Sequence, residues 1–253
     1  MIRQKDFKKR FGIVTGAASG IGFATVKLLA ERGAGIAMVD INSEQIEQVE
    51  SEIKKLGGHS IAIQADVAKE VDVARMVQET LTALGSIDFL VNNAGILRPT
   101  GFLDLKPAEW DKIIAVNLRG PYLCCRAVIP HMVQQKKGVI VNVSSQAGRS
   151  TSRLGGAHYT ASKAGLLGLT RHVALEMGPH GIRVNAFCPG ATLTPMVTRL
   201  RTSEQLAEVS AKIPLRRYAE PEEQASVIAF LLSEESSFIA GASIDSNGGI
   251  YML

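Results

Sequence analysis

The stretch Thr15-Gly16-Ala17-Ala18-Ser19-Gly20-Ile21-Gly22 follows the short apolar run Phe11–Thr15 and leads into a helical pattern over Gly20–Arg32. Glycines between a strand and a helix permit a tight turn and a close approach of the backbone to a pyrophosphate. The unpaired N–H groups of the helix start add a favourable dipole for an anion. A glycine-rich turn can also serve close packing alone, but its place after the first strand favours a phosphate-binding loop.

Short apolar runs alternate with longer amphipathic ones along the whole chain. The short runs predict seven strands: Phe11–Thr15, Gly35–Asp40, Ser60–Ala65, Phe89–Asn92, Val139–Val143, Arg183–Phe187 and Ala242–Asp245. The longer runs predict helices: Gly20–Arg32, Ser43–Leu56, Lys69–Leu84, Pro107–Gln135, Tyr159–Gly178 and Pro221–Leu232. This alternation predicts an α/β fold, a doubly wound, mostly parallel seven-stranded sheet with helices on both faces. Because no linker or repeat interrupts it, we expect one domain over residues 1–253.

The composition limits the class of protein. The chain has 253 residues, of which 46% are hydrophobic and 21% charged, and this balance excludes intrinsic disorder. The net charge of +4 comes partly from a basic segment over residues 1–10, which we interpret as a solvated lead-in to the first strand. Without interleaved aromatic residues it does not favour nucleic acid as a partner.

Compartment and membrane association are also constrained by the sequence. No apolar stretch reaches about 18 residues, so we expect no transmembrane helix and no membrane partner. The first residues do not match a secretory signal. Three cysteines, Cys124, Cys125 and Cys188, form no metal-binding or disulfide pattern. These features favour a cytoplasmic protein.

Asp40 ends the second predicted strand, eighteen residues after Gly22. An acid at this place in a dinucleotide fold hydrogen-bonds the hydroxyls of the adenosine ribose and repels a 2′-phosphate. No Arg or Lys lies in 17–22 or 41–43 to pair with such a phosphate. The sequence therefore favours NAD over NADP. An acid capping the next helix is the competing interpretation, but Ser43 is better placed for that cap.

Tyr159 and Lys163 are four residues apart, on one face of a predicted helix. A nearby ammonium stabilises a phenolate and lowers the pKa of the phenol, which gives a general acid–base suited to alcohols and ketones. Ser145 ends another predicted strand fourteen residues before Tyr159, and its hydroxyl can return over the same site. Each pattern also occurs by chance.

Together these motifs resemble the short-chain dehydrogenase/reductase family. The resemblance rests on Thr15-Gly16-x-x-x-Gly20-Ile21-Gly22, Asn92-Asn93-Ala94-Gly95, Asn117, Ser145, Tyr159-x-x-x-Lys163 and Pro189-Gly190, and it extends from about Phe11 to Gly249. It implies a catalytic set of Asn117, Ser145, Tyr159 and Lys163, with Tyr159 exchanging the proton of the alcohol. Because the loop between Ser145 and Tyr159 is one residue longer than in many members, Ser144 remains a rival for Ser145.

The resemblance also implies a nicotinamide dinucleotide cofactor and no metal. The residues expected to bind the cofactor are Gly16, Ser19, Gly20, Ile21, Gly22, Asp40, Ile41, Asp66, Val67, Asn93, Ala94, Gly95, Tyr159, Lys163, Pro189, Gly190, Thr192 and Thr194. Asn185 and Asp88 are expected to be structural.

The substrate is expected between Ile96–Leu103, Gln146–His158 and the probable substrate loop 192–217. These segments carry seven arginines, Arg98, Arg149, Arg153, Arg199, Arg201, Arg216 and Arg217, which suit an anionic substrate unless they merely face solvent. Val197, Leu200, Leu206 and Ile213 can equally form an apolar lid.

The leading hypothesis is an NAD(H)-dependent oxidoreductase acting on a secondary alcohol or ketone. A 3-oxoacyl-carrier-protein reductase using NADP(H) is the alternative, with Lys136 and His180 as a weak basic patch for an acidic carrier. A catalytically silent nucleotide-sensing protein is the other class. The resemblance implies a homo-oligomer, with a tetramer favoured.

Overall fold

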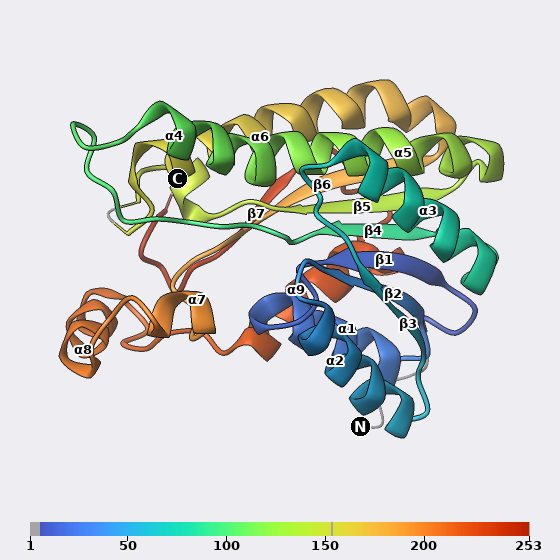
Figure 1. The fold of residues 1–253 in the computed structure, drawn as a ribbon, viewed down its shortest axis with the longest axis horizontal. Coiled ribbons are helices and arrows are strands. Elements are labelled where there is room, and N and C mark those ends of the chain that lie inside the picture. The colour runs from blue at the N-terminus through green and yellow to red at the C-terminus, as the bar shows by residue number, and fades with distance from the viewer. Residues whose placement is uncertain (1–5, 153, 253) are drawn as a thin grey trace.

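The computed structural model describes residues 6–152 and 154–252. Its centre is a parallel sheet in the order β3-β2-β1-β4-β5-β6-β7 (Figure 1). The strands are β1 Phe11–Thr15, β2 Gly35–Asp40, β3 His59–Gln64, β4 Phe89–Asn92, β5 Gly138–Val143, β6 Ile182–Pro189 and β7 Ser243–Ser246. The strand order reverses between β1 and β4. Ligands of such sheets bind at this point, beyond the carboxyl ends of the strands.

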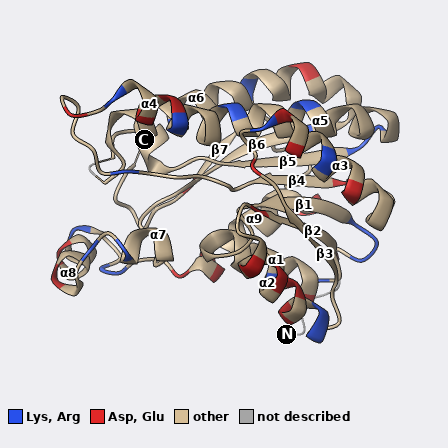
Figure 2. Cartoon of the chain, in the orientation of Figure 1, with Lys and Arg blue, Asp and Glu red and all other residues tan. Residues whose placement is uncertain are grey.

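Helices cover both faces of the sheet, as the sequence predicts. One face is covered by α1 Gly20–Glu31, α2 Ser43–Lys55 and α9 Pro221–Leu232. The other face is covered by α3 Glu70–Leu84, α5 Gly120–Gln135 and α6 Gly156–Met177. Figure 2 shows the charged residues mainly on helices and loops, while the strands are largely uncharged. No helix in the described residues is long and apolar enough to cross a membrane.

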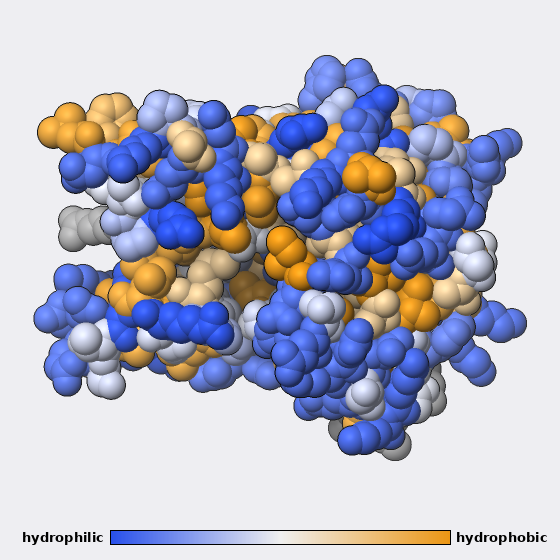
Figure 3. Space-filling view, viewed as in Figure 1, coloured by the Kyte–Doolittle hydropathy of each residue, from blue (hydrophilic) through white to orange (hydrophobic). Residues whose placement is uncertain are grey.

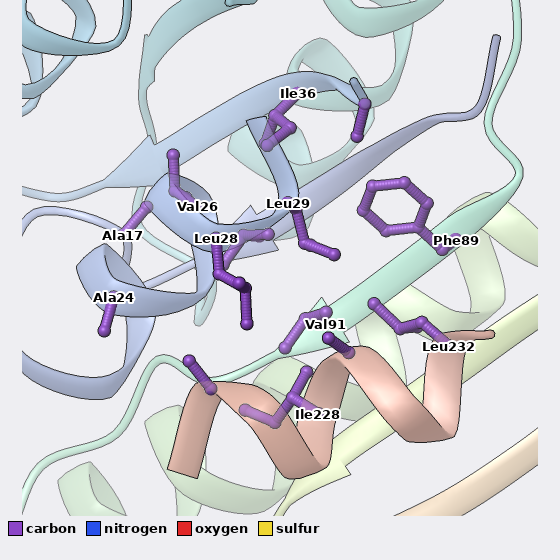
Figure 4. Close-up of a cluster of buried hydrophobic side chains, with 14 of the residues drawn as sticks. Ala17, Ala24, Val26, Leu28, Leu29, Ile36, Phe89, Val91, Ile228 and Leu232 are labelled. Carbon is purple, nitrogen blue, oxygen red and sulfur yellow. The ribbon is translucent and has the colours of Figure 1, made fainter. Parts of the chain in front are cut away.

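The core between α1, α9 and the sheet fixes the glycine-rich turn at the end of β1. Leu28 and Leu29 of α1 point toward Ile228 and Leu232 of α9 and Phe89 of β4, and all five side chains are buried (Figure 4). Burying a side chain of this size stabilises a fold by about 1.5–3 kcal/mol. The start of α1 is therefore held rigidly against the sheet.

Residues 6–10 are only in part the solvated lead-in that the sequence suggests, because Lys8 and Lys9 are exposed but the segment also enters the core. Phe7 is fully buried in the same core, and its backbone N–H donates to the carbonyl of Arg32 at 3.2 Å. Arg10 donates to the carbonyl of Leu232 at 2.8 Å. Arg3 and Lys5 lie outside the described residues.

The helix predicted over Pro107–Gln135 is interrupted. It forms α4 Pro107–Ile114, a π-helical turn over Ala115–Arg119, and then α5. Pro121 has no N–H to donate at the start of α5, and the wider turn places Asn117 in the interior.

Segment 192–217, where the sequence predicts a substrate loop, contains two short helices, α7 Pro195–Thr198 and α8 Ser203–Lys212. A capping box between Thr202 and Gln205 starts α8. The two ends of the excursion are joined by backbone hydrogen bonds, because Ala219 donates to Ala191 at 3.0 Å and Leu193 donates to Ala219 at 2.9 Å. Figure 1 shows α7 and α8 standing apart from the layered body.

Two residues expected to be structural are so. The amide of Asn185 donates to the carbonyl of Ile239 at 2.7 Å and accepts from the N–H of Ala242 at 3.0 Å. The carboxylate of Asp88 accepts the N–H of Phe11 at 2.8 Å. They fix the approach to β7 and the start of β1.

Candidate active site

The turn between β1 and α1 is built on glycines that nothing larger can replace. A Cβ on Gly22 would lie 2.0 Å from the carbonyl oxygen of Gly16, and Gly16 itself has a φ of +64°. The side-chain amide of Asn93 donates to the carbonyls of Thr15 and Gly16 at 3.0 and 2.9 Å. Among the described residues no side chain caps α1, so the N–H groups of its first turn point to solvent-accessible space that suits a phosphate.

A cleft of about 280 Å³ opens from this turn along the carboxyl ends of the strands. Its lining includes most of the predicted site: Gly16, Ser19, Gly20, Ile21, Asp40, Asn93, Ala94, Gly95, Tyr159, Lys163, Pro189 and Thr194. A second cavity of about 330 Å³ shares Gly16, Asp40, Ala94 and Gly95 with it and adds Ile41, Asp66 and Val67. Figure 3 shows a hollow with apolar surface on this side of the molecule. Two joined cavities around a helix N-terminus fit an extended dinucleotide.

Asp40 lies where the two cavities meet. One carboxylate oxygen accepts the N–H of Ala18 and the other the N–H of Asn42, both at 3.1 Å. Asn42, not Ser43, caps α2, because its side chain accepts the N–H of Gln45 at 3.0 Å. The competing interpretation of Asp40 as the helix cap is therefore wrong, and its carboxylate borders the cavities.

Tyr159 and Lys163 lie together on the first turns of α6. The ammonium of Lys163 is 5.7 Å from the centre of the Tyr159 ring and donates to the carbonyl of Val143 at 2.8 Å. Burial lowers the pKa of Lys163 to about 8. Burial also raises the pKa of Tyr159, and a hydrogen bond with Ser145 offsets part of that rise. The sequence predicts a lowered pKa for this phenol, whereas its surroundings in the structure raise it.

Ser145 is the hydroxyl beside Tyr159. It accepts the N–H of Ala147 at 3.1 Å and is only half-buried. Ser144 is buried and donates to the backbone carbonyl of Lys163 at 2.8 Å. The rival serine is occupied in joining β5 to α6, which leaves Ser145 facing the tyrosine.

Asn117 is fully buried in the π-helical turn. Its side chain accepts the N–H of Ile96 and donates to the carbonyl of Ile96, both at 2.8 Å, and it donates to the hydroxyl of Ser162 at 3.2 Å. The hydroxyl of Ser162 donates in turn to the carbonyl of Tyr159 at 2.7 Å. Asn117 therefore connects the segment after β4 to the turn that carries the tyrosine.

Comparison with known proteins agrees with this geometry. A family model described as enoyl-(acyl carrier protein) reductase matches residues 16–251. The chain belongs to the short-chain dehydrogenase/reductase family. It is an oxidoreductase of that type.

The relatives of this short-chain dehydrogenase/reductase differ in their substrates. It is 41% identical over 242 residues to a 3-oxoacyl-[acyl-carrier-protein] reductase of Staphylococcus aureus, covering 95% of this chain and 97% of the other. It is 41% identical over 244 residues to cis-4-hydroxycyclohexanecarboxylate dehydrogenase of Sinomonas cyclohexanicum, covering 96% and 97%. A 3-oxoacyl-[acyl-carrier protein] reductase of Brucella melitensis with bound NAD superposes with a TM-score of 0.92 at 36% identity, covering 100% and 95%.

Three residues of this family member that the sequence predicts to bind the cofactor, Gly22, Gly190 and Thr192, line neither the cleft nor the second cavity. Gly22 packs beneath Gly16, and a Cβ on Gly190 would lie 2.6 Å from the backbone of Asn247. The hydroxyl of Thr192 is buried; it donates to the carbonyl of Gly190 at 3.1 Å and accepts from Gln224 at 3.2 Å. Among the described residues, no group of three or more His, Cys, Asp or Glu side chains is placed to hold a metal ion.

Most of the arginines that the sequence places around the substrate of this dehydrogenase/reductase are bound to other residues of the chain. Four guanidinium groups are bound to other parts of the chain: Arg149 to Asp245 and Ser243, Arg201 to Tyr218, Arg216 to Ala211 and Arg217 to Glu223. Arg98 and Arg199 are exposed, and Arg153 lies outside the described residues. The arginines therefore give little support to an anionic substrate.

Lys136 and His180 do not flank the cleft. They immediately precede β5 and β6, at the amino edge of the sheet, whereas the cleft lies at the carboxyl edge. Within one protomer they are not a docking patch beside the active site.

Several residues that line the cleft or the second cavity are not among those predicted from the sequence. Pro195 and Met196 border the cleft, and Lys112 and Val116 border the second cavity. Proline at the first position of α7 is the one local signal for the first pair. Lys112 and Val116 carry no signal, because α4 and the π-helical turn after it reach the cavity only through the tertiary fold.

Proposed function

We propose that this protein reduces the keto group of 3-oxoacyl thioesters to a secondary alcohol with NADH as the cofactor. The observation that carries the proposal is that Lys163 and Tyr159, the latter hydrogen-bonded to Ser145, lie at one end of a cleft whose other end borders Asp40. Reduced nicotinamide, when bound, supplies a hydride to the carbonyl carbon.

Tyr159 and Ser145 act on the carbonyl oxygen in this proposal. Ser145 donates a hydrogen bond that polarises the oxygen, and Tyr159 transfers its phenolic proton as the carbon receives the hydride. The buried phenol has a raised pKa, so it holds its proton at neutral pH and is ready to act as an acid. In the direction of oxidation the same groups work in reverse.

Lys163 stabilises the charge left on Tyr159. Its ammonium is 5.7 Å from the ring centre, and its hydrogen bond to Val143 keeps it there. The missing side chain of Gly95 preserves room beside it, because a Cβ at that position would lie 3.5 Å from the Lys163 nitrogen. We expect Lys163 also to hold the ribose next to the nicotinamide.

The preference for NADH rests on Asp40. Its carboxylate borders both cavities and would oppose a 2′-phosphate, since like charges in contact cost several kcal/mol. An acid at this position does not count against a 3-oxoacyl substrate, because a similar reductase from Brucella melitensis has NAD bound. Asp66 and Val67 line the second cavity, and in this proposal they would hold the adenine.

The choice of a 3-oxoacyl thioester rests on the relatives and on the apolar surroundings of the cleft. Reductases with that name match 95% of the chain. Met196, which lines the cleft, and Leu200 are 40% and 39% exposed, and Phe102 and Leu103 on the segment before α4 are 76% and 97% exposed. Such surfaces suit the hydrocarbon part of a substrate.

A free cyclic alcohol or ketone is the second candidate substrate. A dehydrogenase for cis-4-hydroxycyclohexanecarboxylate is equally similar, at 41% identity. The same proton and hydride chemistry applies. We further propose that the enzyme acts in the cytoplasm as a homo-oligomer, with a tetramer favoured.

A substrate panel tests the proposal. Acetoacetyl thioesters on acyl carrier protein and on coenzyme A, cyclic ketones and secondary alcohols are each offered with NADH or NADPH (NAD or NADP for the alcohols), and nicotinamide absorbance is followed. Turnover of a 3-oxoacyl thioester with NADH is the expected result. Turnover of cyclic compounds alone would favour the second candidate, and NADH binding without turnover of any member would favour a nucleotide sensor.

A further inference from the structure

The residue before the tyrosine is fixed to another helix. His158 is fully buried, and its Nε2 lies 3.1 Å from the Oε1 of Glu109 in the first turn of α4. Its Nδ1 is buried with no hydrogen-bond partner among the described residues. Glu109 is therefore the one polar anchor of this ring within the described part of the chain.

The start of α6 needs such an anchor. No side chain among the described residues caps this helix, and its first residue, Gly156, has a φ of +68°. A Cβ on Gly156 would lie 2.9 Å from the carbonyl oxygen of Thr100 and 3.2 Å from the Cε1 of His158. The first turn thus packs tightly on the segment before α4, while its backbone N–H groups lack the side-chain acceptor that usually stabilises a helix start.

Glu109 is suited to hold the ring as a carboxylate. A hydrogen bond from Thr100 is the largest cause lowering the pKa of Glu109, followed by the bond to His158 and the charge of Arg98. The ionised group accepts the N–H of the imidazole, and a charged acceptor strengthens the bond. The Glu109 side chain therefore joins α4 to the first turn of α6.

We propose that Glu109 and His158 form a positioning pair that holds the first turn of α6, and with it the phenol of Tyr159, against Ser145. Asn117 and Ser162 hold the same turn from the other side through the carbonyl of Tyr159. The catalytic consequence rests on the proposed function, whereas the structural consequence does not.

Variants of Glu109 test the pair. Glu109→Leu removes the acceptor, and Glu109→Gln restores a neutral one. The matched control is Glu176→Leu, because His172 and Glu176 form a similar contact of 3.0 Å on the exposed side of α6, away from the tyrosine. For each protein we would measure kcat, the KM for NADH and amide hydrogen exchange in the first turn of α6.

Glu109→Leu is expected to lower kcat about tenfold or more, since small misplacements of a reacting group are costly, while the KM for NADH changes less than about twofold. Exchange in the first turn should speed up, Glu109→Gln should recover most of both effects, and Glu176→Leu should resemble the wild type. If Glu109→Leu does not fold, the same measurements are made on Glu109→Gln and His158→Gln. We then expect kcat to fall less in Glu109→Gln than in His158→Gln.

Wild-type exchange and wild-type kcat in Glu109→Leu would overturn the proposal. Faster exchange with unchanged kcat would also overturn it, because the pair would then be structural only. If the wild type turns over no substrate, the proposed function fails, and unchanged exchange would independently reject the anchor.

Discussion

The hydroxyl of Ser144 donates to the backbone carbonyl of Lys163 across 2.8 Å, while the ammonium of the same lysine donates to Val143. The end of β5 is therefore hydrogen-bonded to both the main chain and the side chain of one residue on α6. Because Ser145 comes next in the chain, the distance between the serine and the helix that carries Tyr159 is set by two direct bonds.

Replacing Tyr159 with phenylalanine removes the proton donor and leaves the ring. We expect turnover to fall about 10²–10⁴-fold, the usual contribution of a general acid–base, while NADH binding measured by nucleotide fluorescence is retained. Tyr122→Phe on the exposed side of α5 is the matched control. Substantial turnover by Tyr159→Phe would reject the mechanism.

Asp40→Asn tests the cofactor preference. Removing the charge should strengthen NADPH binding at least about tenfold relative to NADH, measured by titration calorimetry of both nucleotides. Glu44→Gln removes an equal charge from the exposed start of α2 and should leave the ratio unchanged. An unchanged ratio in Asp40→Asn would mean that another group selects the cofactor.

Gly22→Ala tests the packing of the phosphate loop. The added Cβ meets the Gly16 carbonyl at 2.0 Å and the Asn93 amide at 2.5 Å, so we expect a loss of about 1–3 kcal/mol of unfolding free energy and weaker NADH binding. Gly168→Ala in α6 has no neighbour within 4 Å and should stabilise the protein by about 0.5–1 kcal/mol. Chemical denaturation should show a lower unfolding free energy for Gly22→Ala and a higher one for Gly168→Ala, each relative to the wild type.

The stability of the ligand-free protein should depend on pH through Lys163. The pKa of this lysine is about 8 when folded, against 10.5 ordinarily, so between these values the unfolded chain holds a proton that the folded chain has released. Folding therefore becomes more favourable as pH rises through this window, by about 3 kcal/mol in total. The measurement is unfolding free energy against pH for the wild type minus Lys163→Met, in which other alkaline groups cancel. A flat difference would contradict the lowered pKa.

The sheet and the phosphate loop could be predicted from sequence because their signals are local. A fully buried parallel strand such as Val139–Val143 is apolar on both faces, and glycine at 16, 20 and 22 marks a turn that admits no side chain. The family motifs indicated the catalytic residues, and the structure adds that Ser144 is already bonded to the helix.

The remaining features depend on contacts that no short stretch contains. Arg149 is bound to Asp245, 96 residues away in the chain. The sequence around Arg149 therefore could not show that this side chain is not free to bind a substrate. Asn42 and Ser43 are adjacent and chemically similar helix caps, and only the backbone geometry chooses between them. The π-helical turn places Asn117 in the interior, where its partners Ile96 and Ser162 are supplied only by the assembled fold.

The two ends of the excursion that carries α7 and α8 lie side by side, because Ala191 and Leu193 share backbone hydrogen bonds with Ala219. The free energy of closing such a segment grows only with the logarithm of its length. Insertions, deletions or exchanges within α8, in which no residue is buried, therefore cost the rest of the fold little. The sequence of α8 can therefore change in evolution without disturbing the residues that line the cleft.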